Sequence, residues 1–142
     1  MKTIAQFVED RITTLSDLKD ALQTAMQLEF STIPPYLCAQ WSINSDPGGV
    51  GGMIEDIVVQ EMYHFALAGN MLTAIGGVPS IANAAFIPSY PTNVLPGGIP
   101  QKLPVDLKPL TPDSSHEDCS QRGWQMIRTL NRSRRPAGRA LS

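Results

Sequence analysis

The stretch that decides the fold covers residues 54–75, with the sequence IEDIVVQEMYHFALAGNMLTAI. Steps of three and four residues along it pick out one mostly apolar row: Ile54, Ile57, Glu61, His64, Ala68, Met71 and Ile75. Such spacing predicts a helix that turns this row toward a partner. Two members of the row are polar. Because Glu61 and His64 are three residues apart, they are neighbours on one helical face and can hold one ion together.

A second stretch, residues 15–36, has the same pattern. Its row consists of Leu15, Leu18, Leu22, Ala25, Glu29, Thr32 and Tyr36. The spacing predicts another amphipathic helix, again with a carboxylate in the middle of its apolar face. Glu29 occupies a position where an apolar residue is expected.

Burying a carboxylate costs free energy unless it is paired, protonated or bound to a metal. No Lys or Arg occurs between Lys19 and Lys102, so the neutralising group must be His64, a proton, a cation from elsewhere in the fold or a metal ion. A metal fits best, and two carboxylates with one imidazole suit iron or manganese better than zinc. Glu29, Glu61 and His64 are therefore the candidate ligands. The alternative is protonated or solvated groups lining a partly open helix interface.

Two segments carry a family resemblance: LEFSTIPPYLCAQWSI (28–43) and IEDIVVQEMYHFALAGNMLTAIGGVPSI (54–81). Together they resemble the ferritin-like domain family that includes the iminophenylpyruvate dimer synthase of violacein biosynthesis, over about residues 15–110. The family's usual Glu-Glu-Met-x-His appears here at residues 60–64 as QEMYH, which keeps the ligand pair and alters its neighbour.

The resemblance implies an all-α, ferritin-like helical bundle. Ferritin-like di-metal proteins use a Glu from each of two helices and a Glu-x-x-His from each of the other two. By that pattern Glu29 would bind one metal ion terminally, Glu61 would bridge two ions, and His64 would bind through one ring nitrogen. The resemblance further implies a non-haem oxidoreductase that uses dioxygen or a peroxide to oxidise a small organic substrate.

The first helix is expected to begin near Ser16, after a capping pattern headed by Thr14, and to run toward Trp41. Pro34 and Pro35 lie inside it, so we expect a bend or a break one turn after the carboxylate. The carbonyls freed by these prolines could shape a metal pocket, or the kink could be only a feature of the family. Tyr36 could donate a hydrogen bond to the ligands or simply belong to the core.

Residues 44–52, NSDPGGVGG, predict a turn, and hence an antiparallel helix pair. Glu55 and Asp56 should lie in the first turn of the second helix on its outer face, where they favour the helix dipole. Gly76 and Gly77 are expected to end this helix. The segment 79–112 holds eight of the twelve prolines and predicts a crossover, a lid or a linker. Its apolar residues would pack along the bundle or cap a substrate entrance: Phe86, Ile87, Tyr90, Val94 and Leu95.

The last part of the chain differs in charge. Residues 1–111 hold five Lys or Arg against ten acids, whereas residues 112–142 hold six Arg against three acids. We therefore expect the N-terminal half of a ferritin-like domain at 1–111 and a basic, poorly ordered tail at 112–142. The tail contains no second Glu-x-x-His, so the C-terminal half is missing or replaced, as a truncation or a frame shift near residue 112 would produce. His116 to Cys119 is expected to be a solvated loop.

Composition excludes several partners. A net charge of −2 and the lack of aromatic interleaving in the basic tail argue against nucleic acid. No run is apolar enough for a membrane span or a signal peptide, and two distant thiols, Cys38 and Cys119, do not make a disulfide framework. We therefore expect a cytoplasmic protein.

Two helices cannot bury both rows against each other alone. A homodimer, or a partner that supplies the missing half, would cover them and complete the ligand set. The alternatives are a non-catalytic helical fragment that packs on another protein and an interaction module of a larger synthase.

Overall fold

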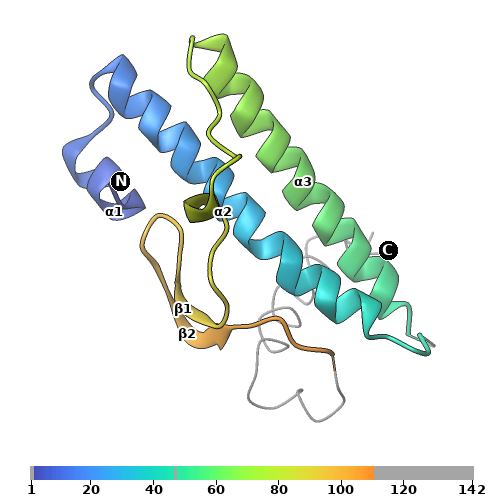
Figure 1. Cartoon of the computed structure of the whole chain (residues 1–142). Coiled ribbons are helices and arrows are strands. Elements are labelled where there is room, and N and C mark those ends of the chain that lie inside the picture. The colour runs from blue at the N-terminus through green and yellow to red at the C-terminus, as the bar shows by residue number, and fades with distance from the viewer. Residues whose placement is uncertain (1, 47, 111–142) are drawn as a thin grey trace, which may run out of the picture. The chain divides into compact units, whose positions relative to one another are not determined.

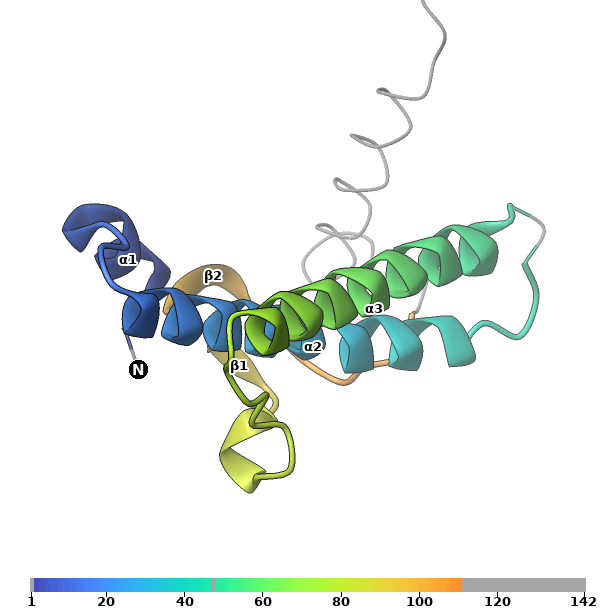
Figure 2. The same cartoon turned by 90° about the horizontal axis from the view of Figure 1, so that it is seen from above.

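Two long antiparallel helices form the main part of the described structure (Figure 1). The computed structural model describes residues 2–46 and 48–110. Within them, α2 (Leu15–Trp41) and α3 (Val50–Ala74) lie side by side in both views (Figure 2). The short α1 (Ile4–Asp10) precedes the pair, and a 3-10 turn, η1 (Ala84–Phe86), follows it. The predicted helical class is confirmed.

After the helix pair the chain forms a small sheet that we did not predict from the sequence. Strands β1 (Thr92–Leu95) and β2 (Ile99–Val105) form an antiparallel hairpin with Leu95 opposite Ile99. The ladder is irregular between Thr92 and Val94. The proline-rich composition concealed this hairpin, because proline removes backbone donors and is tolerated only at strand edges and irregularities.

The core consists of two apolar clusters along the helix pair. One, the Met26 cluster, is built from the buried residues Met26, Ala68, Leu72 and Phe86. The other, the Ile33 cluster, is built from Ile33, Ile54 and Val58. Along α2, Glu29 falls between Met26 and Ile33, and along α3, Glu61 falls between Val58 and Ala68. The two carboxylates thus divide the core.

The predicted apolar row of α3 drifts out of register toward its end. Ile54, Ile57, Glu61 and Ala68 are buried as expected, but Leu72 is buried in place of Met71. An α-helix has 3.6 residues per turn, so a row counted at 3.5 residues per turn rotates off the buried face within a few turns. On α2 the row is wrong at its start, where Leu15 is exposed.

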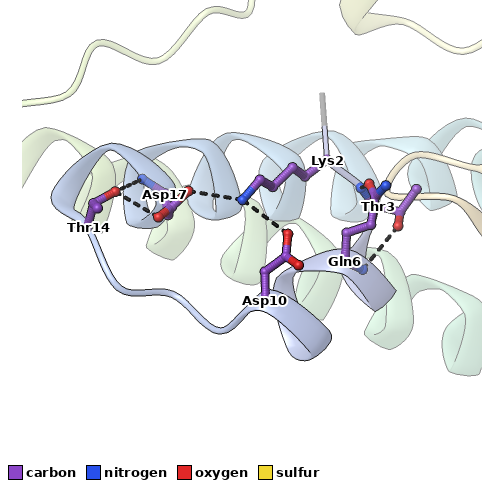
Figure 3. Close-up of polar contacts among 6 residues, drawn as sticks. All are labelled: Lys2, Thr3, Gln6, Asp10, Thr14 and Asp17. Carbon is purple, nitrogen blue, oxygen red and sulfur yellow. Dashed lines mark hydrogen bonds and ion pairs between the residues drawn. The ribbon is translucent and has the colours of Figure 1, made fainter.

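The N-terminal segment is attached to α2 by polar contacts (Figure 3). Thr14 caps α2, as predicted, because its Oγ1 accepts a hydrogen bond from the Asp17 amide at 3.0 Å. Lys2 Nζ lies 3.3 Å from Asp17 Oδ1 and 3.4 Å from Asp10 Oδ2, so it joins α1 to the first turn of α2. Thr3 and Gln6 form a reciprocal capping box on α1.

Pro34 and Pro35 do not break α2, which continues through both. Because Pro35 has no N–H, the carbonyl of Ser31 lacks its usual helical partner. Tyr90, from the crossover, donates its hydroxyl to this carbonyl at 2.6 Å. A tertiary hydrogen bond thus replaces the missing helical one.

The start of α3 lies earlier than predicted. The Asp46 carboxylate accepts hydrogen bonds from the amides of Val50 and Gly51 at 2.6 and 2.8 Å and so starts the helix at Val50. Glu55 and Asp56 are exposed, as expected, but lie beyond the first turn, which contains no acidic residue. Their predicted placement at the positive end of the helix dipole is wrong.

The end of α3 confirms the prediction. Gly76 adopts a φ of 71°, and its amide donates to the Thr73 carbonyl at 2.9 Å. The Gly77 amide donates to the Leu72 carbonyl at 2.9 Å. These two bonds satisfy carbonyls that the last turn leaves free.

After α3 the chain returns along α2. Gln23 exchanges hydrogen bonds with the backbone of Ser80, and Gln27 donates to the Ala85 carbonyl. Because Gln23, Gln27 and Ser31 are four residues apart, the crossover follows one face of α2. Glu29, two residues from Gln27 and from Ser31, lies on the opposite face. The crossover therefore packs along the helix pair, which was one of the two predicted roles; the other was to cap a substrate entrance.

Candidate metal centre

Glu29, Glu61 and His64 come together in the middle of the helix pair. One potential ligand atom from each side chain lies within 4.8 Å of the others. His64 Nδ1 is 3.5 Å from Glu29 Oε2, although the two residues belong to different helices. The antiparallel pairing of α2 and α3 therefore brings together the three residues that the sequence singled out.

The three side chains differ in exposure, and the difference shows where the site opens. Glu61 is 9% exposed. The side chains of Glu29 and His64 are 27% and 52% exposed. The cluster is therefore closed at Glu61, in the helix interface, and opens to solvent at His64.

Burial changes the charge state of Glu61. Desolvation and, after it, a hydrogen bond with the Glu29 carboxyl raise the pKa of Glu61 to about 7. A hydrogen bond from Thr32 and the nearby His64 act in the other direction. Without a cation the deeper carboxyl therefore keeps a proton up to nearly neutral pH.

Thr32 is a contact of the site that sequence reasoning missed. Its hydroxyl lies 3.1 Å from Glu61 Oε2 and 2.8 Å from the backbone carbonyl of Glu29. The signal was present, because Thr32 is three residues after Glu29 in the same row. Tyr36, one turn further on, packs against the Ile33 cluster, in agreement with the core alternative.

Three aromatic rings pack together in the Met26 cluster. The ring centroids of Phe30 and Phe65 are 6.0 Å apart, and both rings contact Phe86. Phe30 and Phe65 directly follow Glu29 and His64 in the sequence. Their rings pack with Phe86 in the Met26 cluster, one position along each helix from a ligand.

The donor set suits a divalent cation. Deprotonated Glu29 and Glu61 supply two negative charges, and neutral His64 supplies a nitrogen donor. Together they balance the charge of one M²⁺ ion, and mixed carboxylate and imidazole ligands suit iron and manganese. The residues present therefore fit a metal ion.

Comparison with known families supports this arrangement. Residues 22–116 match the model of the ferritin-like family, and they include all three candidate ligands. The chain belongs to the ferritin-like family. Curated proteins and solved structures gave no match. The finer resemblance, to the iminophenylpyruvate dimer synthase type, stays a prediction.

Several other expectations concern residues 111–142. The poorly ordered basic tail, the His116 to Cys119 loop and the domain boundary at residue 111 lie outside the described residues. Cys38 is a half-buried free thiol in the part that the structure describes. None of the described helices is long and apolar enough to cross a membrane.

Proposed function

We propose that Glu29, Glu61 and His64 bind iron or manganese, and that the protein is a non-haem oxidoreductase acting on a small organic substrate. The observation that carries the proposal is the convergence of two carboxylates and one imidazole between the Met26 and Ile33 clusters. The buried carboxylate of Glu61, close to the carboxylate of Glu29, is costly to keep charged without a cation. A metal ion bound by the three side chains would offset this cost.

Each ligand has a distinct role in this proposal. Glu29 and His64, the more exposed pair, would bind one ion terminally. Glu61 lies deepest in the helix interface and would bridge to a second ion. Its proton must leave first, and the Thr32 hydroxyl then holds the freed carboxylate in place.

Iron or manganese in such a ligand set supplies one-electron redox chemistry, with dioxygen or a peroxide as the oxidant. The chain's own residues decide access. Glu61 is closed off in the helix interface, so a substrate would approach at His64, where the site is open. Resemblance to the iminophenylpyruvate dimer synthase type supports oxidation of a small organic molecule.

Calorimetric titration with Mn²⁺ tests the proposal. The full chain should bind the ion, and Glu61→Gln should weaken binding at least about 10-fold, because it removes an anionic ligand. Glu55→Gln is the matched control, since Glu55 is an exposed glutamate of the same helix. Equal affinities in the two variants would contradict the proposed ligand role.

One observation favours the second candidate, an interaction module without catalysis. The outer surface of α3 exposes large apolar side chains: Val59, Met62, Tyr63, Leu67 and Met71. Such a surface is typical of a site that another protein covers. Under this candidate the chain binds no metal, and added Mn²⁺ leaves its stability unchanged.

A further inference from the structure

One strip of α3 is both apolar and next to the opening of the ligand cluster. Leu67 and Met71, three and seven residues after His64, share its side of the helix. They are 45% and 49% exposed. The most exposed ligand, His64, therefore lies next to the exposed apolar side chains of Leu67 and Met71. We call the surface formed by Leu67 and Met71 the His64 strip.

Other faces of the two helices are covered by segments of the chain itself. The crossover follows the face of α2 that bears Gln23 and Gln27. α3 faces α2 through the two core clusters. Within the described residues, His64, Leu67 and Met71 remain exposed on the other side of α3.

The ligand set is half of what the fold uses. A ferritin-like di-metal site takes two glutamates and two Glu-x-x-His pairs from four helices. The sequence has a single Glu-x-x-His, Glu61 with His64, and one other histidine, His116. Residues 111–142 follow the end of the described chain at Leu110 and contain no such pair.

We propose that a second copy of this chain docks on the His64 strip and contributes its own Glu29, Glu61 and His64, so that two copies share one two-metal site. The proposal rests on the proposed function above. A twofold axis presents identical patches to each other, so one apolar strip covers its counterpart. The twofold axis also brings together two glutamates and two Glu-x-x-His pairs, which is the complete ligand set of a ferritin-like two-metal site.

The available area is sufficient. A helix of 25 residues, the length of α3, is about 37 Å long, and two adjacent helices are about 20 Å wide. Such a face buries roughly 700 Å² on each copy, or about 1,400 Å² in total, which lies within the range of specific protein interfaces. Since no Lys or Arg occurs between Lys19 and Lys102, the face carries no basic side chain from this stretch that must be desolvated.

The experiment combines mass in solution with the electron paramagnetic resonance spectrum of the Mn²⁺-loaded full chain. We expect a particle of twice the 15.4 kDa chain mass and the spectrum of an exchange-coupled manganese pair. Met71→Arg, in the strip, should give a monomer with the spectrum of isolated ions. Met62→Arg is the matched control: Met62 is 46% exposed on the same helix but on its opposite side.

Three results would overturn the proposal. The first is a dimer whose manganese ions are isolated. The second is a wild-type monomer that binds manganese through Glu61 and His64, which leaves the proposed function intact. The third is an equal effect of both arginine substitutions, with helical content checked by circular dichroism. A wild-type chain that binds no metal at all would instead contradict the proposed function itself.

Discussion

The hydroxyl of Tyr90 donates to the backbone carbonyl of Ser31 at 2.6 Å, across a separation of 59 residues. The carbonyl is free because Pro35, four residues later, has no N–H. Burial raises the pKa of Tyr90 to about 12, so its proton stays available for this bond at all physiological pH values. The bond joins the crossover to the helix that carries Glu29.

We predict that Tyr90→Phe lowers the free energy of unfolding by about 1–3 kcal/mol, because it leaves a half-buried carbonyl without a partner. Urea denaturation of the full chain measures the loss. Tyr63→Phe is the control, since Tyr63 is an exposed tyrosine on α3, and it should change stability by less than about 0.5 kcal/mol.

A double-mutant cycle tests the cause of that loss. Pro35→Ala restores an amide that can bond to the Ser31 carbonyl, so Tyr90→Phe should cost less in that background. Additive effects of the two substitutions would contradict the link between the proline and the tyrosine.

Thr32→Val should weaken Mn²⁺ binding about 10-fold while keeping the side-chain volume. The substitution removes the hydroxyl that stabilises charged Glu61, so the carboxyl gives up its proton less readily. Calorimetric titration measures the change. Thr73→Val is the control, because Thr73 donates only to the Gly69 carbonyl of its own helix. A Thr32 variant with wild-type affinity would show that this contact does not serve the site.

The metal-free protein should lose stability as pH rises from about 4.3 to 7. Glu61 has a pKa of about 7 when folded, against about 4.3 in an unfolded chain, so the folded state binds more protons in this window. Unfolding free energy then falls with increasing pH and levels off above pH 7. Urea unfolding with a chelator at several pH values measures the slope. Glu61→Gln should flatten it relative to Glu55→Gln, and an unchanged slope would exclude Glu61 as its source.

Two glycine substitutions should change the stability of the protein in opposite directions. Gly97 has a φ of 80°, and a Cβ there would lie 2.9 Å from Ile4 Cγ1. Gly97→Ala should therefore destabilise the protein by about 1–3 kcal/mol. Gly52 lies inside α3 with open space around it, so Gly52→Ala should stabilise by up to about 1 kcal/mol. Thermal unfolding compares them, and a neutral Gly97→Ala would mean that the hairpin turn is not fixed against α1.

The sequence predicted the helix pair and the ligand cluster because both depend on local spacing. Glu61 and His64 share a helical face by their separation alone, and Glu29 interrupts an apolar row that a reader can count. The register error at Met71 arose where a repeat of 3.5 was extended over six turns of a helix with 3.6 residues per turn.

The remaining features depend on contacts between distant segments. The start of α3 was placed too late because Asp46 caps it from the preceding loop, outside the usual cap position. The hairpin and the Tyr90 bond depend on where the crossover meets α2, which no periodic pattern encodes. Thr32 could have been found, since its place in the row already put it beside Glu29.

The most direct test is the metal content of the purified full chain, measured by mass spectrometry beside His64→Ala and His116→Ala. These are the only two histidines in the sequence, so each variant is the control for the other. We predict about one iron or manganese ion per chain in the wild type and in His116→Ala, and none in His64→Ala. A metal-free wild type, or a His64→Ala variant that keeps its metal, would contradict the assignment of Glu29, Glu61 and His64 as a metal centre.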